Sequence, residues 1–190
     1  MSCGPVVEQG THFADLCRFI AGEVNLETVQ AQSVEYFDPA GKLSALKINE
    51  SAIPENDRIP RMTSASWSTK DGALCSFNHC LALHGSKYET CIEVYCDGWQ
   101  FRLVDFYGNP TLYIRSPSSD SNEEIFTFQD DDPYFGEFST FIDACENRGP
   151  NLILSTFEDA ARTYQLTWAI REASEKASAA RKSKQFSKVD

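Results

Sequence analysis

The chain has 190 residues, of which 42% are hydrophobic and 12% aromatic, and its formal net charge is −11 at pH 7. This apolar content excludes a globally disordered chain, and a domain of that length buries roughly 70% of its unfolded surface. The acidic charge repels phosphate backbones, so we expect no nucleic-acid partner. No apolar stretch reaches the roughly 20 residues of a membrane span and no secretory leader is visible, so we expect a cytoplasmic protein without membrane contact.

The N-terminal segment, residues 4–22, predicts an amphipathic helix that ends at a capping glycine. It places Glu8, His12 and Asp15 four and three residues apart, and one continuous helix would put all three side chains on one face. An imidazole beside a carboxylate can accept and return a proton near neutral pH. The alternative is that these are ordinary polar residues above an apolar core stripe, since this spacing also arises by chance.

Residues 27–37 predict a first strand with alternate residues on one face. Residues 38–63 hold three prolines and a charged run without periodicity, which predicts a long excursion of a kind that often carries function. Arg58 and Arg61 lie in this excursion and are candidates for contacts with a polar substrate. The alternative for both is an ordinary solvated loop arginine.

From residue 64 onward, short runs of alternating apolar and polar residues follow one another. Asp71-Gly72 and Asp97-Gly98 separate such runs, and this dipeptide is among the strongest short-range signals of a hairpin. The last candidate strand covers residues 124–128. The sequence therefore predicts an antiparallel meander.

Two helices are predicted after the strands, over residues 134–147 and from residue 156 onward. Ser155 and Glu158 form a capping-box pattern at the start of the second helix. The apolar residues of both helices recur at helical spacing, which favours a core stripe over a cofactor site.

Residues 175–190 are rich in Ala, Ser and Lys, and they predict a polar, basic tail that frays. Such a tail can bind an acidic partner, although a solvated terminus is the simpler reading. The fold that we predict for residues 1–174 is α+β, with an open, mainly antiparallel β-sheet and helices packed on one face.

Seven cysteines, an odd number, are spread through the predicted strands and helices and indicate free thiols. A metal site would have to draw on Cys75, His79, Cys80, His84, Cys91 and Cys96. The C-x-x-C spacing of a zinc site is missing, and residues 75 and 80 of one strand would face opposite sides. We therefore predict no metal site.

Three motifs together resemble the C-terminal half of the glucose-fructose oxidoreductase and inositol 2-dehydrogenase family, often written Gfo/Idh/MocA: GPVVEQGTHFADL at the N-terminus, DGALCSF in the first hairpin and STFEDAARTYQLTWAIREAS in the last helix. The resemblance implies an open-sheet domain that contacts the substrate and forms the oligomer interface, beside a Rossmann domain that binds NAD or NADP. It also implies that His12 moves the substrate hydroxyl proton, that Glu8 is the acid of the family's D-x-x-x-H pair, and that Asp15 contacts a sugar or polyol. Glu8 departs from the family's aspartate by one methylene group.

The sequence also departs from the family because it lacks the cofactor-binding motifs. No G-x-G-x-x-G follows a strand, and the family's E-K-P motif with its catalytic lysine is missing. We therefore expect no Rossmann domain and no cofactor bound by this chain alone, whereas a full-length family member would use NAD or NADP, and a separate Rossmann domain would be a partner.

Two hypotheses follow. In the first, the chain is the substrate-binding and oligomerisation portion of an NAD(P)-dependent oxidoreductase, truncated or split from its cofactor half and inactive alone. Its substrate is a small polar molecule such as a sugar or polyol, which Arg58 and Arg61 would help to bind. In the second, the chain is a non-catalytic dimerisation or binding module with a vestigial catalytic set. Both predict a homo-oligomer through the open face of the sheet.

Overall fold

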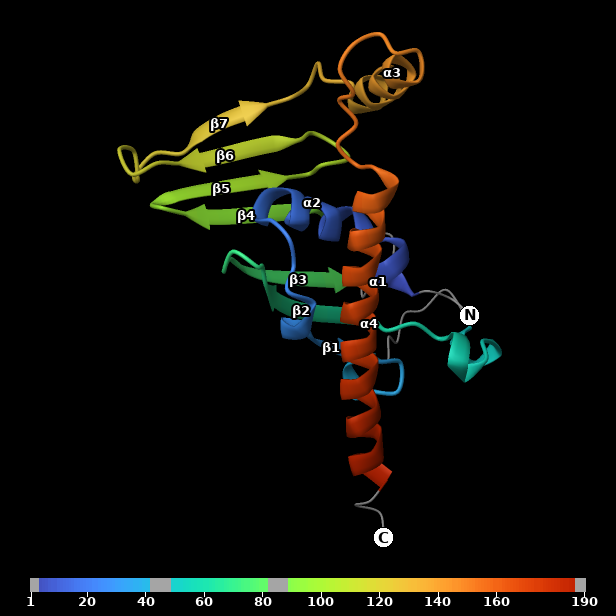
Figure 1. Ribbon diagram of the computed structural model, residues 1–190. Helices are drawn as coiled ribbons and strands as arrows, with labels where there is room; N and C mark the ends of the chain where they lie inside the picture. The colour runs from blue at the N-terminus through green and yellow to red at the C-terminus, as the bar shows by residue number, and fades with distance from the viewer. Residues whose placement is uncertain (1–3, 42–48, 82–88, 187–190) are drawn as a thin grey trace. The chain divides into compact units, whose positions relative to one another are not determined.

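A computed structural model describes residues 4–41, 49–81 and 89–186 of the chain (Figure 1). Its helices are α1 (Pro5–Glu8), α2 (Thr11–Ala21), α3 (Pro133–Cys145) and α4 (Phe157–Phe186). Its strands are β1 (Gln30–Val34), β2 (Met62–Ser68), β3 (Leu74–Cys80), β4 (Cys91–Cys96), β5 (Trp99–Val104), β6 (Thr111–Arg115) and β7 (Glu124–Thr127). The chain divides into two compact units: residues 85–154 form the second unit, and the residues before and after them form the first.

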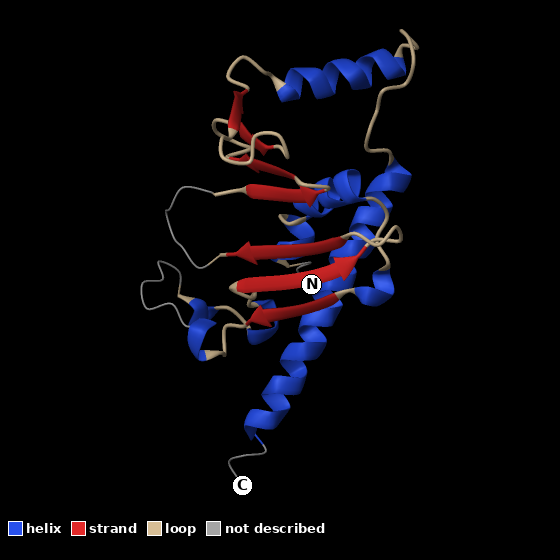
Figure 2. Ribbon diagram, turned by 90° about the vertical axis from the view of Figure 1, so that its left-hand side faces the viewer, coloured by secondary structure: helices blue, strands red, loops and turns tan. Residues whose placement is uncertain are grey.

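The first unit is a three-stranded antiparallel sheet, in the order β1-β2-β3, with α1, α2 and α4 packed on one face (Figure 2). Alternate residues of β2 point into the helix layer, so that Ala65 and Trp67 are buried, and Phe77 joins them from β3. Leu166 and Ile170, four residues apart on α4, are 0% exposed and meet this layer. The core of the unit therefore lies between the sheet and α4.

The N-terminal helix is broken at Gly10. A Cβ atom on Gly10 would lie 2.8 Å from Cζ of Phe77 and 2.8 Å from the carbonyl oxygen of Val6, so only glycine allows this close approach to β3. The prediction of a single helix over residues 4–22 is therefore wrong, and Glu8 and His12 belong to different helices. The predicted end is right, because Gly22 has φ 92° and its N–H donates to the carbonyl oxygen of Arg18 at 2.9 Å.

The start of α4 differs by one residue from the predicted capping box. The N–H of Asp159 donates to Oγ1 of Thr156 at 3.2 Å, so Thr156 caps the helix in place of Ser155. Serine and threonine are both favoured N-cap residues, and the sequence STFED offers them at adjacent positions. The helix prediction itself is confirmed.

The tail expected to fray is helical as far as Phe186. Ser178 is 6% exposed, and its Oγ lies 3.0 Å from Oγ of Ser33 on β1. Arg181 donates to the carbonyl oxygen of Ser33 at 2.6 Å. Hydrogen bonds to β1, in place of apolar contacts, thus hold this part of α4 on the sheet.

The second unit is a four-stranded antiparallel sheet in the order β4-β5-β6-β7, followed by α3. The predicted turn at Asp97-Gly98 joins β4 to β5, with φ of 48° and 84° at its two residues. Residues that pair across the strands share a face. One face, which we name the apolar sheet face, carries Ile92, Val94, Trp99, Phe101, Leu103, Leu112, Ile114 and Phe126.

The predicted α+β class with open antiparallel sheets is confirmed, and the strands pair into two sheets. Within the parts of the chain that the structure describes, no helix combines the length and the apolar character that crossing a bilayer requires.

Candidate functional site

His12 and Glu8 lie at adjoining helix ends. The His12 side chain is exposed on the first turn of α2, and the Glu8 side chain is exposed at the last residue of α1. Gly10 lies between them and packs on Phe77, so the turn is anchored to β3. The structure therefore presents both predicted catalytic residues at the surface, on a backbone that the core of the first unit positions.

Asp15 faces α4. Oγ1 of Thr163 donates to its carboxylate at 2.5 Å, and the guanidinium of Arg18 lies 3.6 Å away. Both contacts are to Oδ1, and the predicted contact of Asp15 with a sugar or polyol stays a prediction.

Arg18 is the centre of this arrangement and is 6% exposed. Its Nη1 donates to Oγ1 of Thr163 at 2.6 Å and to the carbonyl oxygen of Asp159 at 3.1 Å. Its Nη2 donates to Oδ1 of Asp159 at 2.8 Å and to Oε1 of Glu23 at 2.9 Å. We name these four residues with Asp15 the Arg18 cluster. It joins α2 to α4.

The Arg18 cluster shifts the titration of its carboxylates. The hydrogen bond from Arg18 lowers the pKa of Asp159 against a smaller effect of burial. Burial raises the pKa of Glu23, but hydrogen bonds from Arg18 and Arg162 outweigh it and leave the pKa below its usual value. The motifs of the sequence do not predict this cluster. A signal existed, because Arg18 follows the buried Ala14 by one helical turn and so lies on the buried face of α2.

The two arginines of the long excursion have different environments. Arg61 is 7% exposed, forms an ion pair with Glu50, and donates through Nε to the carbonyl oxygen of Gly41 at 3.3 Å. Arg58 donates through Nε to the carbonyl oxygen of Ile53 at 3.0 Å, and its guanidinium carbon lies 4.9 Å from the ring centre of Tyr36. Their roles in substrate binding stay predictions, and the burial of Arg61 weighs against its own.

The structure also locates the cysteines and histidines. Among the described residues, no three His, Cys, Asp or Glu side chains form a group able to hold a metal ion, and His84 lies outside these residues. Burial raises the pKa of the Cys17 thiol to about 11, and the neighbouring Cys75 adds to the effect. Burial also lowers the pKa of His79, whose ring stacks on Phe77 with 6.4 Å between the centres.

Comparison with known proteins gives the family. Residues 1–99 match the family described as "Putative oxidoreductase C terminal domain". The chain is 52% identical over 173 residues to "Uncharacterized protein UNK4.17" of Schizosaccharomyces pombe, in an alignment that covers 90% of this chain and 42% of that protein. The chain thus spans less than half the length of this relative.

Two solved structures share the fold. UDP-N-acetylglucosamine 3-dehydrogenase GnnA from Acidithiobacillus ferrooxidans superposes with a TM-score of 0.61 at 14% identity, over 87% of this chain and 45% of that one. KijD10, a 3-ketoreductase from Actinomadura kijaniata in complex with NADP and TDP-benzene, also gives 0.61, at 12% identity over 90% of this chain and 46% of that one. Because the family match covers more than half of the 190 residues, this chain belongs to the oxidoreductase C-terminal domain family, as its resemblance to the Gfo/Idh/MocA oxidoreductases predicted.

Proposed function

We propose that this chain is the substrate-binding portion of an NAD(P)-dependent oxidoreductase that acts on a hydroxyl or carbonyl group of a sugar-like substrate. The family match supports an oxidoreductase. The names of GnnA and KijD10 describe a 3-dehydrogenase of a sugar nucleotide and a 3-ketoreductase, which makes a nucleotide-linked sugar the substrate class that we favour.

The observation that carries the proposal is the exposed imidazole of His12 on an anchored turn. In the proposed reaction, His12 accepts the proton of the substrate hydroxyl while the adjacent carbon loses a hydride, and it returns the proton in the reverse direction. Glu8, at the neighbouring helix end, would orient the imidazole. Neither side chain belongs to the apolar core.

The residues of this chain do not fit a dinucleotide. No strand is followed by G-x-G-x-x-G anywhere in the sequence, so the chain lacks the phosphate-binding turn of a Rossmann domain. We assign NAD or NADP to a cofactor domain on a longer protein or a partner chain, where the bound nicotinamide accepts or supplies the hydride. This chain alone should therefore be inactive.

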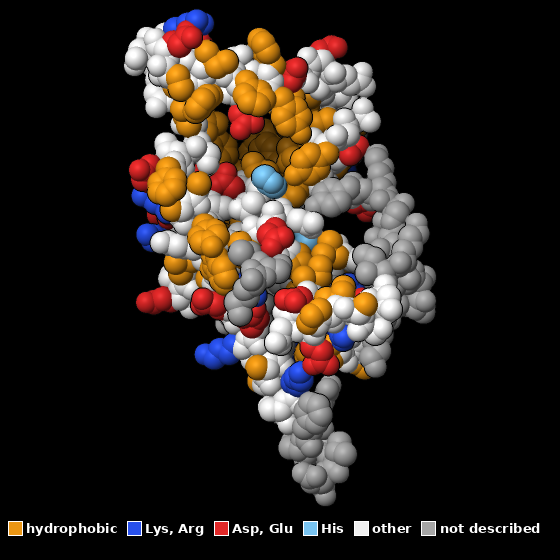
Figure 3. All heavy atoms as spheres, turned by 90° about the vertical axis from the view of Figure 1, so that its right-hand side faces the viewer, with side chains coloured by type: hydrophobic (Ala, Val, Ile, Leu, Met, Phe, Trp, Pro, Cys, Tyr) orange, Lys and Arg blue, Asp and Glu red, His pale blue; other side chains and the backbone are white. Residues whose placement is uncertain are grey.

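A second candidate function, assembly, rests on the second unit. Phe135, Phe138 and Phe141 of α3 are 70%, 64% and 57% exposed. Hydrophobic side chains gather at the top of the space-filling view, where α3 lies (Figure 3). Large exposed apolar patches mark interaction surfaces. We propose that the chain self-associates through the second unit, which on its own would make it a dimerisation or binding module with a vestigial catalytic set.

The test of the enzymatic proposal measures the formation of reduced nicotinamide by a longer protein in which this chain follows a cofactor domain. Nucleotide sugars, free sugars and polyols are offered with NAD or NADP. His12→Ala should lower kcat by roughly 10²- to 10⁴-fold, as the loss of a general acid or base does. Glu27→Gln, at an exposed position of the same unit, is the control and should leave kcat unchanged. Unchanged turnover by His12→Ala would contradict the proposed role.

Turnover by the longer protein separates the two candidates, and the size of the particle in solution shows whether an inactive protein still assembles. An inactive longer protein that still forms a well-folded oligomer would favour assembly. Activity of this short chain by itself would overturn the assignment of the cofactor to another domain.

A further inference from the structure

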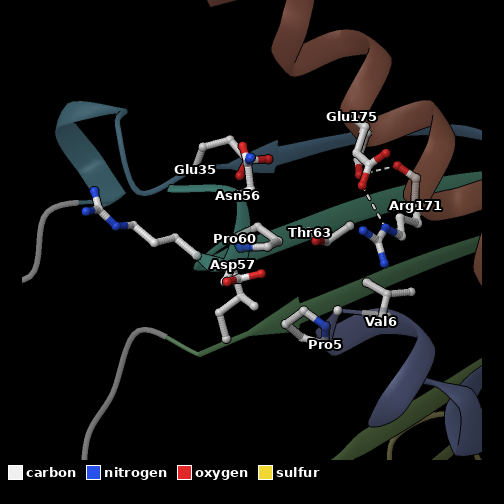
Figure 4. A pocket seen from close by; sticks show the side chains of 13 residues that line it. Pro5, Val6, Glu35, Asn56, Asp57, Pro60, Thr63, Arg171 and Glu175 are labelled. Carbon is white, nitrogen blue, oxygen red and sulfur yellow. Dashed lines mark hydrogen bonds and ion pairs between the residues drawn. The ribbon is translucent and has the colours of Figure 1, made fainter. Parts of the chain in front are cut away.

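A pocket of about 120 Å³ in the first unit involves none of the predicted catalytic residues (Figure 4). Its wall comes from the start of α1, the end of β1, the short helix Glu55–Asp57, the start of β2 and the middle of α4. A cavity of about 150 Å³ holds benzene, so this pocket suits a molecule of about six non-hydrogen atoms. We name it the Thr63 pocket.

Thr63 contributes a side-chain hydroxyl to the pocket. Thr63 is 2% exposed, and no described residue forms a hydrogen bond with its side chain. The neighbouring Ser33, its partner in the strand register, instead bonds to Glu35 and Ser178. The labelled side chain of Thr63 lies in the middle of the pocket (Figure 4). The Thr63 hydroxyl is open to the pocket, so a ligand there can form with it a hydrogen bond that no described protein group makes.

Glu35 supplies a fixed negative charge to the same pocket. Its Oε1 accepts hydrogen bonds from Oγ of Ser33 at 2.5 Å and from Oγ of Ser178 at 3.1 Å. Among the described residues none donates to its Oε2. Asp57 adds an exposed carboxylate on the same side of Thr63 (Figure 4). Arg58 also lines the pocket, but its guanidinium is engaged by the carbonyl oxygen of Ile53 and the ring of Tyr36, so the two carboxylates leave this side attractive to a positively charged group.

Arg171 supplies a positive charge on the other side of Thr63 (Figure 4). Its Nε donates to Oε1 of Glu175 at 2.7 Å, and its guanidinium carbon lies 5.0 Å from the ring centre of Trp168. Both contacts hold the guanidinium in place. Glu175 is 58% exposed, so solvent weakens its neutralising effect on Arg171. This side of the pocket attracts a negatively charged group.

We propose that the Thr63 pocket binds a small zwitterion that carries an ammonium and a carboxylate group, such as a short amino acid. The ammonium group lies at Glu35 and Asp57, the carboxylate at Arg171, and the Thr63 hydroxyl bonds to the ligand between them. Pro5 and Pro60 give this pocket apolar walls for the methylene groups. A ligand with a single charge meets repulsion at one of the two ends, so the pocket selects against it.

Isothermal titration calorimetry on this chain at neutral pH tests the proposal. The probes are glycine, β-alanine and γ-aminobutyrate, with methylamine and acetate as single-charge analogues and glycerol as a neutral polyol. At least one amino acid should show saturable binding about tenfold tighter than either single-charge analogue. Failure of all three amino acids to bind at millimolar concentration would overturn the proposal, and so would tighter binding of glycerol.

Variants of Thr63 and Glu35 locate the binding. Thr63→Val is nearly isosteric and should weaken binding about tenfold by removing one hydrogen bond. Thr63→Ser keeps the hydroxyl and should retain it, while Glu35→Gln should weaken it at least as much as Thr63→Val. Glu137→Gln, at an exposed position of α3, is the charge-matched control. Undiminished binding by a Thr63→Val protein with native circular dichroism would overturn the assignment to this pocket.

Discussion

Replacing Arg18 with methionine should destabilise the first unit, because its guanidinium is the buried charge that joins α2 to α4. Arg18 makes four hydrogen bonds in the Arg18 cluster, three of them to side-chain or main-chain atoms of Asp159 and Thr163 and one to Glu23. Methionine fills much of the space of the arginine stem, so the substitution mainly removes the charge and these bonds.

The expected cost follows from the exposure of the partners. Breaking a buried ion pair costs about 3–5 kcal/mol when the remaining charge stays buried. The side chains of Asp159 and Glu23 are 33% and 41% exposed, so water can solvate both carboxylates after the guanidinium is lost. We therefore expect Arg18→Met to lower the free energy of unfolding by about 3 kcal/mol, the low end of that range.

The assay is urea denaturation followed by tryptophan fluorescence. Trp67 and Trp168 belong to the first unit and Trp99 to the second, so a Trp99→Phe background makes the signal specific for the first unit. Arg162→Met is the matched control. Arg162 is 55% exposed and bonds only to Glu23 among the described residues, at 3.0 Å, so its loss should cost less than about 1 kcal/mol. Equal costs for the two variants would refute the reasoning.

The same cluster predicts a pH dependence. The pKa values of Asp159 and Glu23 are lower in the folded protein than in the unfolded chain, where they are about 3.9 and 4.3. Such groups stabilise the fold at pH values above their unfolded pKa, and this contribution is lost as the pH falls through the folded pKa. The stability difference between wild type and Arg18→Met should therefore be constant near neutral pH and shrink below about pH 4.

Two further experiments, one substitution and one alkylation, test the packing of the first unit. Gly10→Ala should lower the stability of the first unit by about 1–3 kcal/mol in the same urea assay, since its Cβ would lie 2.8 Å from Phe77, whereas Gly136→Ala on α3 meets nothing within 4 Å and should not destabilise. Alkylation of the native protein with iodoacetamide at pH 8, followed by mass spectrometry, should label the exposed Cys96 well before Cys17, whose pKa burial raises to about 11. Early labelling of Cys17 would show that its environment is open.

Features set by neighbouring residues were predictable from the sequence. The Asp97-Gly98 turn needs two residues that tolerate positive φ, and the sequence supplies a dipeptide that does. Gly22 ends α2 for the same local reason. The helix α4 also follows from its apolar spacing, but its buried face does not, because Ile170 is fully buried whereas Phe157 and Tyr164 are 85% and 51% exposed.

Features set by contacts between distant segments were not predictable. The break at Gly10 depends on Phe77, which only the folded sheet brings close. The Arg18 cluster depends on Asp159 at the start of α4. A helix pattern within residues 4–22 therefore could not predict that His12 is exposed while Asp15 is hydrogen-bonded to α4. The helical tail beyond residue 175 depends on hydrogen bonds to β1, which composition does not reveal.

The second unit exposes both polar and apolar side chains to solvent. On the polar face of the second sheet, hydrogen bonds run from Glu93 through Tyr95 and Gln100 to Arg115, so that face is suited to water. Helix α3 of the same unit instead exposes apolar side chains. A buried aromatic side chain covers about 150–250 Å², so the three exposed phenylalanines of α3 alone leave roughly 400 Å² of apolar surface in solvent.

That area already equals the largest apolar patch of a typical monomer, about 300–600 Å², before any of the apolar sheet face is added. In the first unit, α4 covers one face of the sheet with the fully buried Leu166 and Ile170, while Phe19, Leu74 and Phe157 stay exposed. We therefore expect part of this apolar surface to be covered when another chain or domain binds the second unit. Both candidate functions predict such a partner, which is a cofactor domain or a second subunit for the oxidoreductase and a second copy of the chain for the assembly module.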